Sequence, residues 1–176
     1  IVKDHYGFIW VGTKDGLNRF DGREFQVFQY QARSNSVCGN NISCLEITDD
    51  SLLWIGTASN GFCSYDYRTN QFKSFTSQNS KLRVDNINDL VFDRRRNCLW
   101  IALNNGGLQQ FDLSKMQINP KIFSYNTYYA VAVKDSLAFF AGITESLKTL
   151  NYLGKAIINA DGNGQTINTI YIDTDS

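Results

Sequence analysis

Few residues of this 176-residue chain have the types and spacing that catalysis requires. His5 is the only histidine, and it lies in a predicted turn between two strands, where a surface turn residue is the simpler interpretation. A Ser-His-Asp or Cys-His arrangement would have to be built around this one exposed group. Carboxylates are abundant, but no pair stands apart as the two acids of a glycosidase. The sequence therefore predicts no catalytic residue and no enzymatic activity for this segment.

Three short runs resemble ligand loops, and each has a simpler structural interpretation. Residues 161–165 resemble the start of a calcium loop, but its sixth and twelfth positions are Thr166 and Ile172, so a turn fits better. The basic run 94–96 is a solvated turn or an anion contact. Residues 104–107 lack the Lys-Ser/Thr that follows a phosphate-binding glycine loop. We expect neither a metal nor a cofactor.

The four cysteines, Cys38, Cys44, Cys63 and Cys98, form no Cys-x-x-Cys pair and have no metal-ligand spacing. We interpret them as buried free thiols, which behave as small hydrophobic residues. They do not indicate a redox compartment.

A sequence repeat that runs along the whole chain predicts its secondary-structure elements. Trp10, Trp54, Trp100 and Phe140 follow one another at intervals of 44, 46 and 40 residues. Each is followed by a Gly- or Ser-led run that ends, in the first three copies, in an aromatic residue and an aspartate. Intervals of this length are typical of four-stranded propeller blades.

Four strand-like runs, which we name A to D in chain order, fill each repeat. The apolar run A lies at 42–47, 87–92, 129–133 and 167–172; B contains the Trp or Phe, and C ends at the Asp. The aromatic run D lies at 25–30, 72–75, 122–125 and 156–158. No segment has a helical apolar period. The chain is predicted to be all-β, a β-propeller fragment of about four four-stranded antiparallel blades.

One segment, 1–176, is expected to contain all blades: 1–36, 37–80, 81–126 and 127–160, with the first strand of a further blade at 165–174. The first blade is expected to contain only B, C and D. Strand A is expected at the inner position that neighbouring blades cover, and the more polar D at the rim.

The repeated residues are predicted to be structural. The rings pack between blades, the threonine hydroxyls satisfy backbone groups, the glycines form the B to C turn and the aspartates close the C to D turn. The residues assigned to this scaffold are Trp10, Gly12, Thr13, Gly16, Asp21, Trp54, Gly56, Thr57, Gly61, Asp66, Trp100, Gly107, Asp112 and Phe140.

The first repeat carries a family resemblance. Ile1, Asp4, Gly7 and Ile9, together with residues 10–13 and 16–21, closely resemble the two-component regulator propeller repeat. Ala102, Leu103 and Phe140 depart from it. The Gly-His and Trp-Asp signatures of WD40 blades are missing. The resemblance implies the periplasmic sensor region of a hybrid two-component histidine kinase of the Bacteroidetes type, which senses oligosaccharides.

Ligand-contact residues are expected on the face where the D to A and B to C loops emerge, because the D to A loops at 31–41, 77–86 and 159–166 are long and irregular. The candidates on this face are Lys14, Asp15, Arg33, Asn35, Asn60, Arg83, Asn104, Asn105 and Glu145.

The composition of the chain limits the classes of binding partner that we expect. Seventeen basic and seventeen acidic residues give zero net charge, so nucleic acid is not an expected partner, and no apolar run is long enough to span a bilayer. A chain that opens on Ile1 is expected to be part of a longer protein. Unpaired strand edges at the ends predict self-association. An oligosaccharide sensor, a structural or protein-interaction propeller and, third, a propeller glycosidase or lyase remain as functions.

Overall fold

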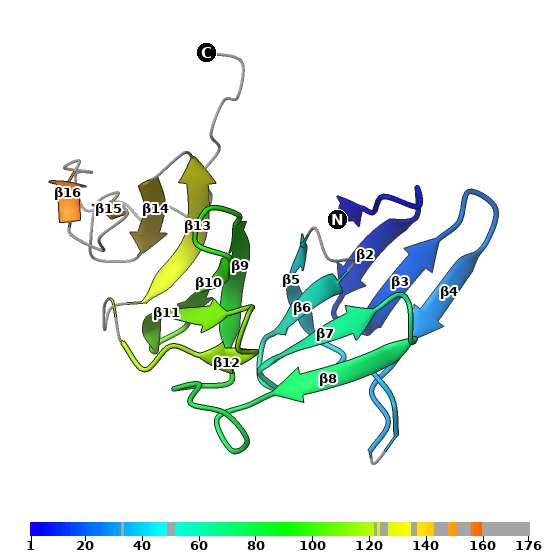
Figure 1. Cartoon of the computed structure of the whole chain (residues 1–176). Coiled ribbons are helices and arrows are strands. Elements are labelled where there is room, and N and C mark those ends of the chain that lie inside the picture. The colour runs from blue at the N-terminus through cyan, green and yellow to red at the C-terminus, as the bar shows by residue number, and fades with distance from the viewer. Residues whose placement is uncertain are drawn as a thin grey trace. The chain divides into compact units, whose positions relative to one another are not determined.

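The computed structural model describes residues 1–32, 34–48, 52–121, 123, 127–134 and 137–142, and the backbone of 148–150 and 156–159. Within this part of the chain every regular element is a β-strand. The strands form four separate four-stranded antiparallel sheets, each a meander whose neighbours follow one another along the chain (Figure 1). This confirms the predicted all-β class and the four-stranded blades.

The bounds of the sixteen strands follow the repeat. The first sheet contains β1 (Val2–Lys3), β2 (Ile9–Thr13), β3 (Gly16–Phe20) and β4 (Phe25–Phe28), and the second β5 (Ile42–Ile47), β6 (Leu52–Thr57), β7 (Phe62–Asp66) and β8 (Gln71–Phe75). The third contains β9 (Ile87–Asp93), β10 (Cys98–Leu103), β11 (Gly107–Asp112) and β12 (Gln117–Ile118), and the fourth β13 (Tyr128–Lys134), β14 (Leu137–Gly142), β15 (Lys148–Leu150) and β16 (Ala156–Asn159).

One expectation about the strands was wrong. The first sheet has an A strand, because Val2 pairs with Trp10 and Lys3 with Ile9. The most buried strands are the B strands β6 and β10, all of whose residues are buried. Strand B lies between strands A and C and is paired on both sides, whereas strand A lies at an edge of its sheet. The predicted last A strand, at 167–172, lies outside the described residues.

Pro120 changes the third D strand. The sequence predicts this strand at 122–125, but β12 ends at Ile118. Proline has no amide hydrogen and cannot donate to a ladder. Pairing resumes beyond it, since the amide of Phe123 donates to the carbonyl of Leu108 at 3.1 Å. The rest of 122–125 lies outside the described residues.

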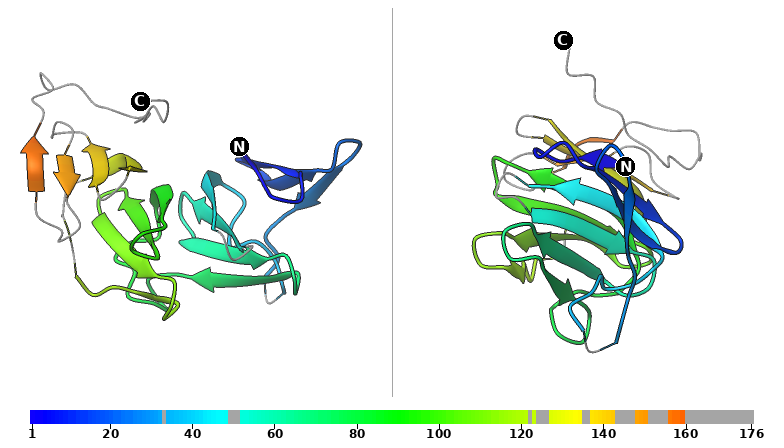
Figure 2. Two further views of the ribbon diagram at one scale, coloured as in Figure 1. Left: turned by 45° about the horizontal axis from the view of Figure 1, so that its top comes forward. Right: turned by 90° about the vertical axis from the view of Figure 1, so that its right-hand side faces the viewer.

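The chain divides into two compact units, Ile1–Leu90 and Val91–Ser176. In the first unit, sheets β1–β4 and β5–β8 pack face to face (Figure 2). Trp10 and Leu17 from one sheet meet Ile55, Cys63 and Tyr65 from the other in a buried apolar cluster. In the second unit, Trp100 and Ala102 of β10 share a cluster with Tyr128 of β13 and Phe140 of β14. In each unit, the hydrophobic core therefore forms where two sheets pack together around the repeated Trp or Phe side chain.

Candidate ligand-binding face

In the first three sheets, the repeated tryptophan holds the turn between strands A and B by a hydrogen bond. The indole N–H of Trp10 donates to the Asp4 carboxylate at 2.7 Å, and that of Trp54 donates to the Thr48 hydroxyl at 3.1 Å. The indole of Trp100 donates to Asp93 at 3.1 Å. Each acceptor lies at the A to B turn six or seven residues before its tryptophan. A buried indole N–H needs such an acceptor, so the pair is a structural unit.

The fourth repeat replaces both members of this pair. The ring of Phe140 has no N–H, and the residue six positions before it is Lys134, which has no acceptor atom on its side chain. Phe140 is nevertheless buried, and its ring meets that of Tyr128 edge-on with centroids 5.1 Å apart. The ring position is therefore kept for packing while the hydrogen bond is not.

At the opposite end of the sheets, threonine hydroxyls hold the B to C turns. Thr13 Oγ1 donates to the carbonyl of Gly16 at 2.9 Å and accepts the amide of Asp15 at 3.1 Å. Thr57 does the same with the carbonyl of Gly61 and the amide of Asn60. Gly16 and Gly61 have φ of +123° and +70°, which a residue with a Cβ rarely adopts.

The third B to C turn lacks this threonine, because Leu103 occupies its position. The hydroxyl of Thr127, in the loop that precedes β13, accepts the amide of Asn105 at 3.0 Å and donates to the Asn105 side chain at 2.9 Å. Asn105 has a φ of +57°, and Gly107 after it has a φ of +83°. A hydroxyl from a neighbouring loop thus replaces the missing one.

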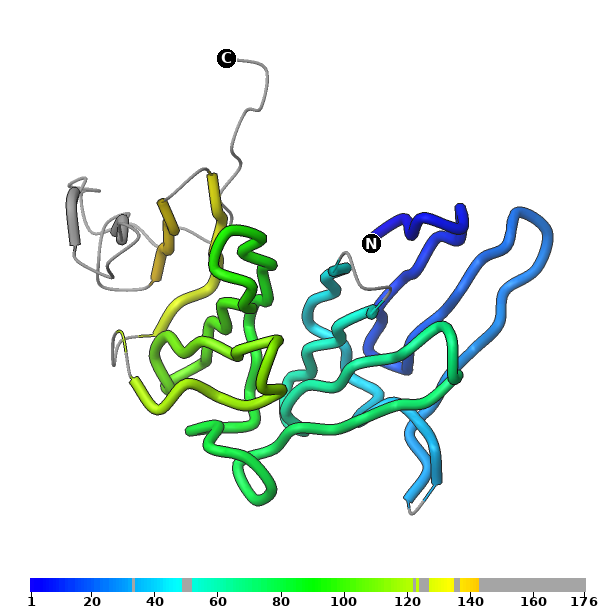
Figure 3. Tube along the Cα trace, viewed as in Figure 1, coloured from blue at the N-terminus to red at the C-terminus, as the bar shows by residue number. Residues whose placement is uncertain are grey.

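The D to A loops fasten the B to C turns of the first unit to one another. The carbonyl of Asn40 accepts the amide of Gly16 at 2.8 Å, and the carbonyl of Asn41 accepts the amide of Ala58 at 2.9 Å. Figure 3 shows this loop in light blue between β4 and β5. The next loop repeats the contact, since Gly61 donates to the carbonyl of Asp85 at 2.8 Å. The turns and loops form one continuous polar edge, which we call the turn ridge: residues 13–16, 40–41, 57–61 and 85.

The side chains of Asn40 and Asp85 close their own loops. Asn40 Oδ1 accepts the amide of Tyr30 at 2.7 Å, and Asp85 Oδ1 accepts the amide of Ser77 at 2.7 Å. Each lies two residues before the A strand. Neither residue was predicted from the sequence, although their matching positions before Ile42 and Ile87 would have identified them.

Three predicted ligand residues lie on the turn ridge and are exposed: Lys14, Asp15 and Asn60. Gln29 donates through Nε2 to the Asp15 backbone carbonyl at 3.2 Å and to its carboxylate at 3.3 Å. The Ser59 hydroxyl donates to the Asn60 side chain at 3.0 Å. The ridge therefore presents a cation, a carboxylate and an amide on a backbone that its own hydrogen bonds hold in place.

The remaining candidates lie elsewhere or have other contacts. Asn35 donates to the carbonyl of Asn70 and accepts the amide of Phe72, both at 2.7 Å, so its amide group fastens the loop to the rim of the second sheet. Arg83 is exposed in the second D to A loop. Asn104 and Asn105 form the B to C turn of the second unit. Arg33 and Glu145 lie outside the described residues.

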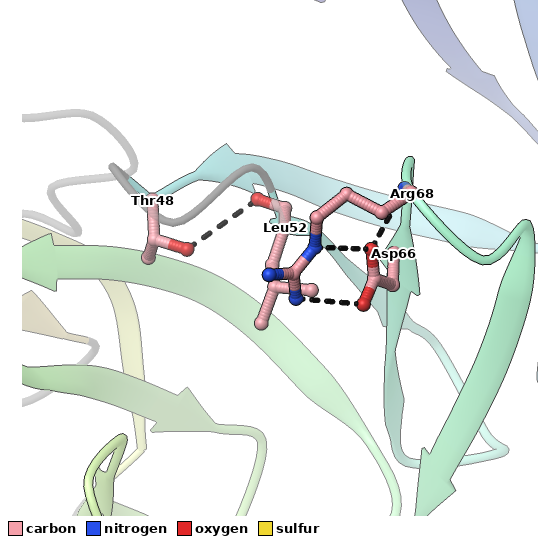
Figure 4. Close-up of polar contacts among 4 residues, drawn as sticks. All are labelled: Thr48, Leu52, Asp66 and Arg68. Atoms are coloured by element: carbon pink, nitrogen blue, oxygen red, sulfur yellow. Dashed lines mark hydrogen bonds and ion pairs between the residues drawn. The ribbon is translucent and has the colours of Figure 1, made fainter.

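The aspartates at the end of strand C close the C to D turns. Asp21 Oδ1 accepts the amides of Arg23 and Glu24, both at 2.8 Å. Asp66 accepts the backbone amide of Arg68 at 2.8 Å and pairs with its guanidinium (Figure 4). Asp112 accepts the amide of Lys115 at 3.1 Å.

These contacts lower the carboxyl pKa of all three aspartates. Hydrogen bonds from the backbone amides of Glu24 and Arg23 lower the pKa of Asp21. The side-chain hydrogen bond from Arg68 and its backbone amide lower the pKa of Asp66. All three aspartates are therefore charged structural residues at neutral pH.

The A to B turn of the first sheet meets Tyr67, which follows β7 of the second sheet, in an aromatic group that the sequence did not predict. The rings of His5 and Tyr6 contact each other in a tilted arrangement with centroids 3.9 Å apart, and the Tyr67 ring lies 5.9 Å from His5 and 5.7 Å from Tyr6. Burial and the Asp4 carboxylate raise the pKa of the Tyr67 phenol. His5 itself is exposed, and we find no group of three His, Cys, Asp or Glu side chains able to hold a metal among the described residues.

Comparison with known proteins identifies the fold. The extracellular domain of a hybrid two-component system from B. thetaiotaomicron superposes with a TM-score of 0.86 at 21% sequence identity, over 99% of this chain and 26% of that domain. The two chains share one fold. A second such domain from the same organism gives a TM-score of 0.65 at 15% identity, over 98% of this chain and 29% of that one. The predicted resemblance is thereby confirmed at the level of structure.

Sequence comparison gives one short match. A stretch of 29 residues is 52% identical to Histidine kinase P4 of Formosa agariphila and covers 16% of this chain and 2% of that protein. No protein-family model matches the chain. The chain spans about a quarter of the solved extracellular domains. Among the described residues, no helix is long and apolar enough to cross a membrane.

Proposed function

We propose that the chain is a noncatalytic segment of the periplasmic sensor propeller of a hybrid two-component histidine kinase, and that its turn ridge contacts an oligosaccharide. The observation that carries the proposal is the ridge itself: Lys14, Asp15 and Asn60 project from turns that Asn40 and Asn41 tie together. A neutral oligosaccharide offers many hydroxyl groups, and a chain of zero net charge with mixed donors and acceptors on its surface suits such a ligand. The fold shared with two extracellular receptor domains supports the location.

Thermal unfolding in the presence of a glycan library tests this proposal. A ligand present at 100 times its dissociation constant stabilises the folded state by about 2.7 kcal/mol, which shifts the melting temperature by several degrees. Lys14→Ala and Asn60→Ala are expected to reduce the shift, because both change the ridge. Arg23→Ala is the matched control, since Arg23 is exposed in the C to D turn at the other end of the same sheet.

Three results would count against the proposal. If no glycan shifts the melting temperature, the proposal that the chain binds an oligosaccharide is wrong. If Arg23→Ala loses the shift as fully as the ridge variants do, the turn ridge is not the binding site. Release of a product from a glycan by the isolated chain would indicate a glycosidase or lyase instead.

A structural role is the second candidate, and an exposed apolar sheet face favours it. Ile9, Phe25 and Val27 lie on the face of the first sheet that points away from Trp10, and their exposed fractions are 37%, 62% and 57%. The corresponding face of the second sheet, with Leu53 and Ile55, is buried. The same face of a second copy would cover this area in a symmetric dimer.

A further inference from the structure

The fold brings two cysteines of the first unit together. Cys38 lies in the loop between β4 and β5, and Cys63 lies on β7. The amide of Cys38 donates to Sγ of Cys63 at 3.3 Å. Both residues are buried in one cluster with Val37 and Ile55. The contact joins the loop to the sheet that follows it.

Strand alternation keeps Cys44 away from this pair. Cys63 is the cross-strand partner of Ile55, on the face of the second sheet that packs against Trp10. Cys44 is the partner of Gly56, one residue further along β6, so it lies on the other face. There it adjoins the space beside Gly56 that Ile87 also borders. Cys98 belongs to the cluster of the second unit.

We propose that Cys38 and Cys63 form a disulfide bond that fastens the first D to A loop to the second sheet. The oxidant is an external disulfide, such as oxidised glutathione. One cysteine loses its proton and attacks this disulfide, which gives a mixed disulfide and one released thiolate. The second cysteine, after losing its proton, attacks the mixed disulfide and releases the other thiolate. Two protein thiols are oxidised, and one external disulfide is reduced to two thiols that take up the two protons.

The environment of Cys38 predicts when the bond forms. Burial, with a further contribution from the Cys63 thiol, raises the pKa of Cys38. Because the thiolate is the reacting form, oxidation of the folded chain is slow and requires the loop to open. Oxidation during refolding, when both thiols are accessible, is expected to be much faster. The two rates are separable in a quenched time course.

Mass spectrometry tests the pairing directly. The chain is unfolded and reduced, refolded with a mixture of reduced and oxidised glutathione, and blocked with an alkylating reagent. We expect two alkylated cysteines, Cys44 and Cys98, and one peptide pair that joins Cys38 to Cys63. Four alkylated cysteines, or a link that contains Cys44 or Cys98, would overturn the proposal. This measurement uses the unaltered chain and does not depend on how well any variant folds.

Variants then test what the bond does. Closing this loop is expected to raise the melting temperature by roughly 5–10 °C relative to the reduced chain. The difference is expected to vanish in Cys38→Ser and Cys63→Ser and to persist in Cys44→Ser and Cys98→Ser. Equal melting temperatures for the oxidised and reduced chain, with the link present by mass, would show that the bond does not fasten the loop.

Discussion

At the residue scale, each tryptophan depends on the acceptor that its indole N–H reaches. Asp4 also accepts the amides of Tyr6 at 3.0 Å and Phe8 at 2.9 Å. One buried carboxylate therefore satisfies three donors. Removing it leaves buried donors without a partner, which costs more than the loss of an exposed hydrogen bond.

Asp4→Ala is expected to lower the free energy of unfolding by about 2–4 kcal/mol in urea titrations. Asp21→Ala is the matched control, since it removes an exposed turn closer and should cost about 1 kcal/mol. In a Trp10→Phe background the cost of Asp4→Ala should shrink, because one of the three donors is gone. Additive costs would show that Asp4 acts only through the turn.

Acid should weaken the Asp66 contact. A carboxyl group whose pKa is lower in the folded than in the unfolded chain stabilises the fold above the ordinary value of 3.8 and loses this contribution as the pH falls through the folded value. Unfolding free energies measured between pH 7 and pH 2.5 should fall more steeply below about pH 4 in the parent chain than in Asp66→Asn. The difference is small and shrinks with salt, because Arg68 is exposed. Parallel profiles would contradict it.

At the element scale, the glycine of the B strand lets the next A strand approach. A Cβ on Gly12 would lie 2.9 Å from Cβ of Ile42, and one on Gly56 would lie 2.9 Å from Cγ2 of Ile87 and close to the Cys44 sulfur. These glycines are required by packing and not by backbone conformation. Ala102 fills the same position in the third repeat and is buried.

Gly56→Ala is expected to lower the free energy of unfolding by about 1–3 kcal/mol, because the methyl group overpacks a filled space. Adding Cys44→Ala should recover part of the loss by removing the sulfur. Ala102→Gly is the comparison in the third repeat and should cost about 1–2 kcal/mol, through added backbone freedom and the loss of a buried methyl group. A neutral Gly56→Ala would mean that the A strand can shift.

The strands could be predicted from the repeat. Contacts between residues that lie far apart in the sequence could not. The spacing of Trp10, Trp54 and Trp100 is enough to assign strands B and C. Each tryptophan marks a B strand, and the run that ends at the aspartate after it is strand C. The residues that accept the indole hydrogen bonds were not predicted, because their types and their spacing from the tryptophan differ between repeats. The contact from Thr127 to Asn105 joins residues that are 22 positions apart and follows no local pattern.

At the scale of the whole molecule, the exposed face of the first sheet predicts association between copies. Replacing Phe25 and Val27 together by serine should leave the fold intact, because both are exposed, and should reduce any concentration-dependent mass increase in light scattering. Lys73→Ser with Gln71→Ser, exposed on the edge strand β8, is the control. A chain that is monomeric at all concentrations before mutation would remove the structural candidate function.

The loss of the tryptophan in the fourth repeat has an optical consequence. Three sheets each contain one buried indole, hydrogen-bonded to its own turn, and no Trp occurs in the sequence of the fourth. Tryptophan fluorescence therefore reports directly on the first three sheets, and it senses the fourth only through the packing of Tyr128 and Phe140 in the cluster of Trp100. Chains that retain a single Trp would assign each emission change to that indole and its packing partners, so that the order in which the sheets lose their structure becomes visible in a spectrometer.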